Sequence, residues 1–182
     1  MASFDIVKYG EPVLNKKCSS VSQFLDIKLV IENMFDSMYE AEGIGLAANQ
    51  IGLNMNLFII DVTHTDEAED THVFINSEIL AYKGEKTFFQ EGCLSLPGIA
   101  LDVERPEKVV LKYQTVDQEW HEDEFKGLLS RAIQHEIDHL NGIFIVDRVS
   151  EIEKIKYRNE LKKLAADSKY SQKNKNKENF VL

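Results

Sequence analysis

Gln134-His135-Glu136-Ile137-Asp138-His139 is the stretch that decides the fold, because its two histidines can act together only when the chain around them is helical. A spacing of four residues brings His135 and His139 to one face of a helix, one turn apart, with Glu136 beside the first. This H-E-x-x-H pattern on a helix is a signature of zinc hydrolases. The first hypothesis is therefore a hydrolase in which a metal ion activates a water molecule.

The neighbouring sequence supplies the helix. Apolar residues recur at helical spacing, namely Leu128, Leu129, Ala132, Ile133 and Leu140. Asn141-Gly142 follows, and a glycine just beyond the last periodic residue is the usual left-handed end of a helix. We predict a helix over residues 126–140 with both histidines in its last two turns.

A catalytic zinc site needs three protein ligands, so the third must come from elsewhere. The extended metzincin pattern fails, because Ile145 stands where its third histidine belongs. Glu160 would serve in a thermolysin-like site, but it lies among basic residues on what reads as an amphipathic surface helix. Cys93 is the remaining source, and Gly92 beside it permits close approach of the backbone.

Three segments together resemble a known family. They are Gly43-Ile44-Gly45-Leu46-Ala47-Ala48-Asn49-Gln50, Glu91-Gly92-Cys93-Leu94-Ser95 and Gln134-His135-Glu136-Ile137-Asp138-His139. In order and spacing they match the three motifs of the peptide deformylases, and none departs from the family pattern. The resemblance extends from Val7 to Ala166, which is nearly the whole chain.

The resemblance implies a mononuclear metal site with Cys93, His135 and His139 as ligands and a water molecule in the fourth position. Three protein ligands and one open position are what a catalytic site of this kind requires. Glu136, beside the metal without binding it, would take a proton from the water and pass it to the leaving amine.

The resemblance also implies how negative charge is stabilised in the tetrahedral intermediate. The side-chain amide of Gln50 and the backbone N–H of Leu94 would donate to the oxyanion. Gln134 and Asp138 are expected either to support the metal ligands or to have a structural role, and Glu91 to orient its neighbours.

The segment from Gly43 to Gln50 has two readings. On the residues alone, two glycines after a helix indicate the end of that helix and a turn. A phosphate-binding loop is excluded, because such a loop follows a strand and no strand is predicted before these glycines. The resemblance implies instead that the segment is extended, and that Gly43 and Gly45 let a peptide backbone pair with it. The pocket for methionine is then expected among Ile44, Phe89, Leu128 and Ala132, with Arg105 near its mouth.

The resemblance therefore implies hydrolysis of the N-formyl group from the initiating methionine of new polypeptides, with release of formate. One divalent metal ion is the expected cofactor. A thiolate and two imidazoles suit iron(II), zinc, nickel or cobalt, and the family favours iron(II) in the cell. One alternative is a zinc endopeptidase of the HExxH type, which should need neither Cys93 nor Gln50. Another is a catalytically silent family member that binds metal or peptide, against which the intact Glu136 argues.

Composition indicates a single catalytic domain, which we place at residues 1–166. The chain has 182 residues, 43% of them hydrophobic, enough for one buried core. Its two cysteines offer no disulfide framework. No apolar run is long enough to span a membrane, and the first residues lack the pattern of a signal peptide. We therefore expect a cytoplasmic protein without membrane contact.

Charge is unevenly distributed along the chain. The net charge is −10, with an acidic excess in residues 1–150 and a basic excess in residues 151–182. An acidic body argues against DNA binding. Because deformylases act on nascent chains, the basic end is a candidate contact with the ribosome, although a solvated helix face would have the same composition. Residues 167–182 are polar and are predicted to form a disordered tail.

The remaining segments predict an α+β fold. A helix is expected from Ser22 to near Gly43, and a last helix from a capping box at Ser150 and Glu153 to about Ala166. Strands are expected at residues 57–61, 73–80, 86–90, 99–103, 109–116 and 119–125, with a surface loop at 66–70. Because the strands are grouped between helices, we predict mainly antiparallel sheets around the central helix that carries the HExxH motif, with an N-terminal and a C-terminal helix.

Overall fold

The computed structural model describes residues 3–66 and 68–178, with side chains as far as Lys169. In chain order the elements are a 3-10 helix (Pro12–Asn15), α1 (Ile27–Glu40), β1 (Gly45–Ala47), a 3-10 helix (Ala48–Ile51), β2 (Leu57–Ile60), β3 (His72–Gly92), β4 (Ala100–Gln114), β5 (Trp120–Lys126), α2 (Gly127–Leu140), a 3-10 helix (Ile145–Asp147), α3 (Glu151–Lys156) and α4 (Arg158–Glu178). The strands form one antiparallel sheet in the order β1-β2-β3-β4-β5. The predicted α+β class with an antiparallel sheet is confirmed.

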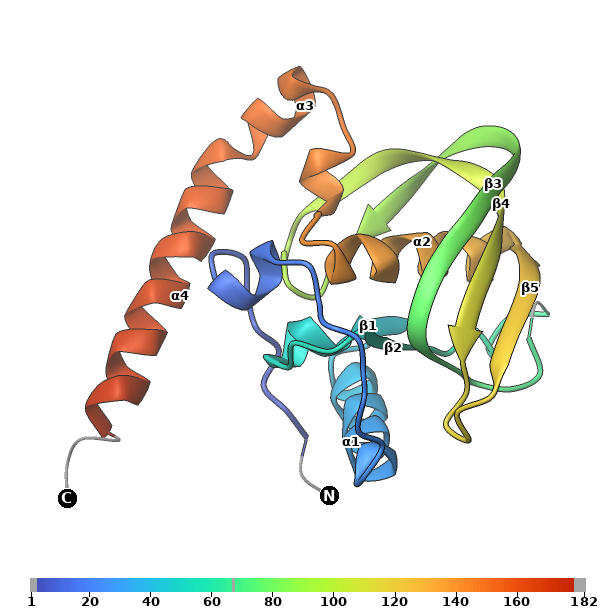
Figure 1. The fold of residues 1–182 in the computed structure, drawn as a ribbon. Coiled ribbons are helices and arrows are strands. Elements are labelled where there is room, and N and C mark those ends of the chain that lie inside the picture. Colours follow the sequence, from blue (N-terminus) through green and yellow to red (C-terminus); the bar gives the residue numbers. More distant parts are fainter. Residues whose placement is uncertain (1–2, 67, 179–182) are drawn as a thin grey trace.

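Strand β2 is buried on both faces because helices cover both. All four residues of Leu57–Ile60 are inaccessible to solvent. Phe58 and Ile60 pack with α2, whereas Leu57 and Ile59 pack with α1. A short continuous apolar run is typical of such a strand. Helices α1 and α2 therefore lie on opposite sides of this part of the sheet (Figure 1).

Strands β3 and β4 are long and continuous, which differs from the sequence prediction of two shorter strands in each region. They form a hairpin that curves past α2 (Figure 1). Gly84, at a φ of +78°, and Pro106, which has no N–H to donate, lie between the strands that were expected to be separate. The pairing of β3 with β4 shifts in register at several points, one of them between Lys83 and Lys86, and then continues beyond these residues.

Helix α2 begins and ends close to the prediction. It covers Gly127–Leu140, and Gly142 follows at a φ of +73°. A Cβ at Gly142 would stand 2.8 Å from the backbone of Asn15, so this turn also needs a glycine for close packing. Helix α1 begins at Ile27 rather than Ser22, because Asp26 adopts a left-handed conformation at its N-terminus.

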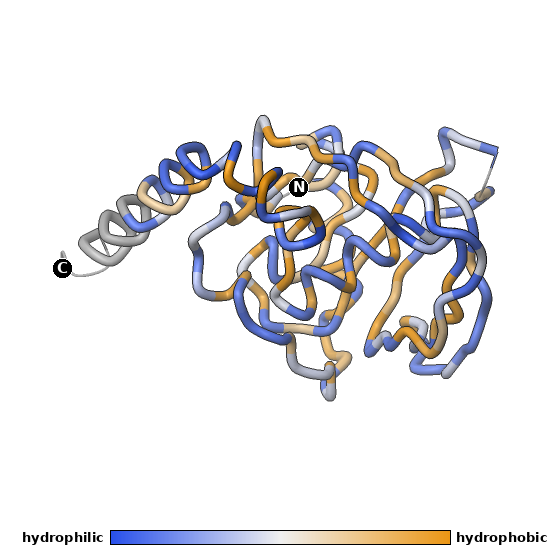
Figure 2. Tube along the Cα trace, turned by 90° about the horizontal axis from the view of Figure 1, so that it is seen from above, coloured by the Kyte–Doolittle hydropathy of each residue, from blue (hydrophilic) through white to orange (hydrophobic). Residues whose placement is uncertain are grey.

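The C-terminal region differs from its prediction. Ser150 caps α3 by accepting a hydrogen bond from the Glu153 N–H, as the capping box predicts, but the helix breaks at Tyr157 and α4 then continues to Glu178. The expected last helix thus extends beyond Ala166, the predicted disorder of residues 167–182 stays a prediction, and residues 179–182 lie outside the described part. Figure 2 shows hydrophilic positions along much of α4 as it leaves the body of the molecule. A polar composition did not exclude a helix here, because alanines and Leu161 and Leu164 give its first turns an apolar side.

Among the described residues, no helix combines the length and the apolar composition that crossing a bilayer demands.

Candidate metal centre and active site

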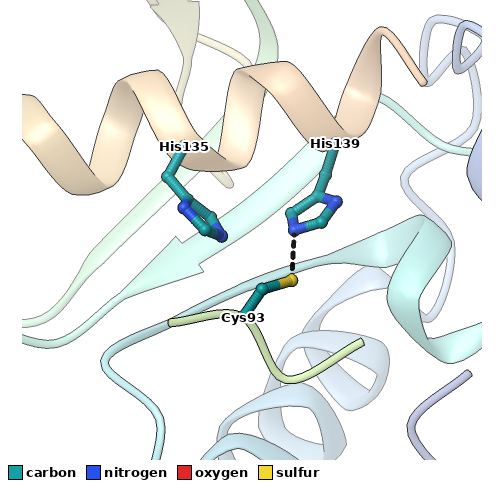
Figure 3. A group of neighbouring side chains, drawn as sticks. All are labelled: Cys93, His135 and His139. Atoms are coloured by element: carbon teal, nitrogen blue, oxygen red, sulfur yellow. Dashed lines mark hydrogen bonds between the residues drawn. The ribbon is translucent and has the colours of Figure 1, made fainter. Parts of the chain in front are cut away.

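Helix α2 and the end of β3 bring a sulfur and two imidazoles together. The ligand atoms of Cys93, His135 and His139 all lie within 4.8 Å of one another, and Cys93 Sγ is 3.1 Å from His139 Nε2. Both histidines project from one face of α2 toward Cys93, which directly follows β3 (Figure 3). More than forty residues of chain separate the sulfur from the imidazoles, and only the tertiary structure joins them.

Glu91 fixes the orientation of the first histidine. Its Oε2 is 3.0 Å from His135 Nδ1, which leaves His135 Nε2 for a metal ion. A carboxylate behind a ligand histidine is the usual arrangement in metal sites. This geometry agrees with the prediction that Glu91 orients its neighbours.

The donor set fits a divalent metal ion. One thiolate and two imidazoles make a three-ligand site. Two buried polar atoms of this cluster, His139 Nδ1 and Glu136 Oε2, have no hydrogen-bond partner among the described residues. Burying these groups together carries a desolvation cost that a cation would offset.

The electrostatics of the cluster favour ionised ligands. Burial alone would raise the pKa of Cys93, but His139 and His135 outweigh it and lower that pKa to about 5. Burial would likewise raise the pKa of Glu91, yet His135 and Arg105 bring it down to about 2. A thiolate at neutral pH is the form that binds metal.

Glu136 is 4% exposed and lies against Gly45 of strand β1. A Cβ at Gly45 would stand 2.5 Å from Glu136 Oε1, so the space left by the absent side chain is filled by this carboxylate. A Cβ at Gly43 would in turn meet Leu94 Cδ1 at 2.7 Å. Both positions therefore need glycine, because Glu136 and Leu94 fill the space that a side chain would take, and pairing of this backbone with a peptide stays a prediction.

Gln50 is held with its amide NH2 toward Cys93. The Ala47 N–H donates to Gln50 Oε1 at 2.9 Å, which assigns the oxygen end of the side chain. The nitrogen end, Nε2, is 3.2 Å from Ser95 Oγ and 3.9 Å from Cys93 Sγ. The Leu94 N–H donates to no acceptor in the described part of the chain. Two donors thus flank the candidate metal site.

Comparison with known proteins agrees with this geometry. A family model described as polypeptide deformylase matches residues 3–155. A peptide deformylase of Acidobacterium capsulatum is 45% identical over 150 residues, which cover 82% of this chain and 88% of that protein. The chain belongs to the peptide deformylase family. It therefore hydrolyses the formyl amide at the N-terminus of new polypeptides.

Solved deformylase structures share its fold. A Plasmodium falciparum peptide deformylase matches with a TM-score of 0.84 at 38% identity, covering 91% of this chain and 98% of that one. The enzyme of Synechococcus elongatus, solved in complex with actinonin, matches with a TM-score of 0.78 at 41% identity, covering 90% and 86%. The likeness thus spans nearly the whole of each protein.

A cavity of about 730 Å³ opens beside Cys93 and His135 of the candidate metal site of this deformylase. Its lining contains most of the residues predicted to bind substrate, namely Gly43, Ile44, Gly45, Phe89, Leu128 and Ala132. Gln50, Cys93, Leu94, His135 and Glu136 line it as well. Of the residues predicted to bind substrate, all but one therefore line this cavity, and their role in binding stays a prediction.

Arg105 is that exception, because it does not line the cavity. It is 3% exposed and donates to Glu91 at 2.7 Å and to Asp138 at 2.9 Å. Arg131 lies at the cavity instead, with its guanidinium 5.4 Å from the Phe89 ring and hydrogen-bonded to Glu91 at 2.9 Å. Arg131 stands one helical turn before His135, and that spacing was the sequence signal that could have identified it.

We expect Arg105→Met to lower the free energy of unfolding by about 3–5 kcal/mol, because it leaves buried Glu91 and Asp138 short of a counter-charge. Urea unfolding followed by circular dichroism measures the change. Lys83→Met, which breaks an exposed ion pair with Glu124, is the matched control and should leave the free energy of unfolding nearly unchanged. Equal effects of the two substitutions would contradict the buried network.

The two cysteines of this deformylase should differ sharply in reactivity. In metal-free protein at pH 7, iodoacetamide should modify Cys93, whose pKa is about 5, and leave Cys18, whose pKa burial raises to about 11. Peptide mass spectrometry identifies the site of modification. Loading zinc or nickel should protect Cys93, and a Cys93 that reacts equally with and without metal would contradict its role as a ligand.

Proposed function

We propose that Cys93, His135 and His139 hold one divalent metal ion and that the HExxH helix α2 carries the deformylase reaction. The observation that supports this most directly is the convergence of the three ligand atoms next to a cavity that Cys93, His135 and Glu136 line. When bound, a divalent ion supplies Lewis acidity, which lowers the pKa of a water molecule toward neutrality. Formate release from formyl-methionyl peptides tests the proposal, with the variants described in the Discussion.

Glu136 is the proposed general base and general acid. Burial raises the pKa of its carboxyl group, against the opposing effect of His135 and His139, so the group is suited to both accepting and releasing a proton. Its Oε2 has no hydrogen-bond partner in the described part of the protein. The carboxylate is therefore available to take a proton from water and deliver it to the departing amine.

Gln50 Nε2 and the Leu94 N–H are the proposed donors to the oxyanion. Both belong to residues that line the cavity next to Cys93. The Ala47 N–H and Ser95 Oγ hold the Gln50 amide in place before substrate arrives. Donors fixed in advance stabilise developing charge without reorganising during the reaction.

Strand β1 is the proposed docking edge for the substrate backbone. Within the described part of the chain it pairs with β2 alone, because it is the first strand of the sheet. An extended peptide can add to such an edge by main-chain hydrogen bonds. The formylated methionine would then place its side chain in the pocket formed by Ile44, Phe89, Leu128 and Ala132.

Iron(II) is the proposed metal in the cell, with zinc, nickel or cobalt able to bind the same ligands. A thiolate ligand beside ferrous iron is open to oxidation. We expect the iron form to lose activity in air within a period over which the nickel form keeps it. Parallel assays of formate release in aerated and anaerobic buffer measure this, and equal stability of the two forms in air would contradict the prediction.

A zinc endopeptidase remains the alternative function of another class, since it shares HExxH. Cleavage of internal, unformylated peptide bonds would favour it. The burial of Gln50 beside Cys93 argues for the deformylase, because an endopeptidase of that type requires neither residue.

The proposed partners are N-formylmethionyl nascent peptides and, through the basic C-terminal end, the ribosome. Lys162 and Lys163 are exposed on α4, where an RNA surface could reach them. A Lys162→Glu, Lys163→Glu variant should then lose co-sedimentation with ribosomes at low salt, and unchanged co-sedimentation would remove the proposal. Cytoplasmic location stays a prediction from the sequence.

A further inference from the structure

Lys8 in the N-terminal segment lies at the active-site cavity and is not explained by the motifs. Its side chain is half-buried and lines the cavity. Its Nζ donates to the carbonyl oxygen of Leu94 at 2.8 Å. An ammonium group that is partly buried against a single carbonyl loses hydration. This burial lowers the pKa of Lys8. Such a contact needs a reason.

The contact falls on the turn that follows the cysteine. The Leu96 N–H donates to the Cys93 carbonyl at 2.9 Å, which makes Cys93–Leu96 a turn with Leu94 and Ser95 at its centre. The Leu94 carbonyl is bound by Lys8, and the Ser95 carbonyl accepts from the Tyr9 N–H at 2.9 Å. Every carbonyl from Cys93 to Ser95 is therefore held, whereas the Leu94 N–H donates to no described acceptor.

The same N-terminal segment also holds the other proposed oxyanion donor. The Val7 N–H donates to the Gln50 carbonyl at 2.7 Å. Helix α4 in turn holds this segment in place. Ser168 Oγ donates to the Lys8 carbonyl at 3.2 Å. Gly10 packs closely against Ala165, because a Cβ at Gly10 would stand 2.6 Å from the Cα of Ala165. Residues 7–9 thus brace both sides of the oxyanion site from a part of the chain outside the three motifs.

We propose that Lys8 is a positioning residue, which fixes the Leu94 N–H for the oxyanion through its hydrogen bond to the Leu94 carbonyl. The inference rests on the proposed role of Leu94. The Leu94 N–H shares its peptide plane with the Cys93 carbonyl, whereas the Leu94 carbonyl belongs to the next plane, and the two planes can turn about the bonds of the Leu94 Cα unless both are held. The Leu96 N–H holds the first plane through the Cys93 carbonyl, and the Lys8 ammonium is the only side-chain group among the described residues that holds the second. Because the bond is charge-assisted, it holds the turn more firmly than a neutral donor would.

The test compares Lys8→Met, Lys8→Arg and the control Lys17→Met, an exposed lysine of the same N-terminal segment. Methionine keeps the unbranched length of lysine without a donor, and arginine keeps the charged donor. We expect Lys8→Met to lower kcat for a formyl-methionyl peptide about tenfold or more. This loss is smaller than the loss expected when a whole oxyanion donor is removed, because the Leu94 N–H is still present. KM should stay within about threefold of wild type. Lys8→Arg should recover most of kcat, and Lys17→Met should match wild type.

Two further measurements separate positioning from a merely structural role. Metal content per chain should be equal in all variants, and hydrogen exchange of the Leu94 amide in the zinc form should be faster in Lys8→Met than in wild type. If Lys8→Met does not fold, Lys8→Gln, which removes the charge and shortens the side chain, serves in its place.

Three results would overturn the inference. These are an unchanged kcat, a rise in KM alone, which would make Lys8 a substrate contact, and a fall in kcat matched by loss of metal. Failure of the proposed function is a different outcome, in which wild type releases no formate or Glu136→Gln is as fast as wild type.

Discussion

Replacing Glu136 with glutamine is expected to lower kcat for formate release about 10²–10⁴-fold, the range for loss of a general acid–base group. Glutamine keeps the size of the side chain in a position where Gly45 leaves no excess space. It cannot accept the proton from water or return it to the amine. KM should change little, because Glu136 is not assigned to substrate binding.

The metal must stay bound for this result to be informative. Glu136 is not among the three grouped ligand residues, so the variant should keep the metal content of wild type by elemental analysis. Glu160→Gln is the matched control: Glu160 is an exposed glutamate on α4, and its loss should leave kcat unchanged. A Glu136→Gln enzyme as fast as wild type would disprove the proposed proton transfer, and a slow Glu160→Gln enzyme would revive the thermolysin-like ligand set.

Replacing Cys93 with alanine is expected to abolish both metal binding and activity. Substituting a residue that only supports a metal ligand typically costs 10–100-fold in metal affinity, so loss of a ligand should exceed about 100-fold. The remaining His135 and His139 would leave a two-ligand site, below the three that catalytic metal sites use. Metal content after dialysis and formate release measure the two effects together.

Cys18→Ala provides the control for this substitution. Cys18 is buried in the core formed with α2 and lies outside the cavity lining, so its loss should alter stability slightly and leave metal content intact. A Cys93→Ala protein that retains metal and turnover would show that the sulfur is not a ligand and would favour an endopeptidase-type site.

Periodicity and motif chemistry were sufficient for much of the fold. The 3.6-residue repeat and Asn141-Gly142 delimited α2, and the apolar run of residues 57–60 gave β2. These features are local, because a helix or strand is encoded by residues a few positions apart. The prediction of separate strands on either side of Gly84 and Pro106 was wrong, since the long hairpin continues past these residues with local shifts of register.

Only those residues of the candidate site that belong to a sequence motif could be predicted. The motif resemblance supplied Cys93, His135 and His139, and the structure brings them together. It misplaced Arg105, because no pattern distinguishes a buried arginine from one at a cavity mouth until the positions of Glu91 and Asp138 are known. Lys8 had no signal at all, since its significance lies in a carbonyl 86 positions away in the chain.

The sequence by itself determined which residues form the helix of the histidines and which chemistry those histidines, a glutamate and a cysteine could perform. Only the tertiary structure decided that Gly45 makes room for Glu136, that Arg105 is enclosed by carboxylates, and that the N-terminal segment supports the turn after Cys93. The physical reason is that backbone propensity and periodicity act over a few residues, whereas burial, close packing and ion pairing depend on chain segments that meet only after folding.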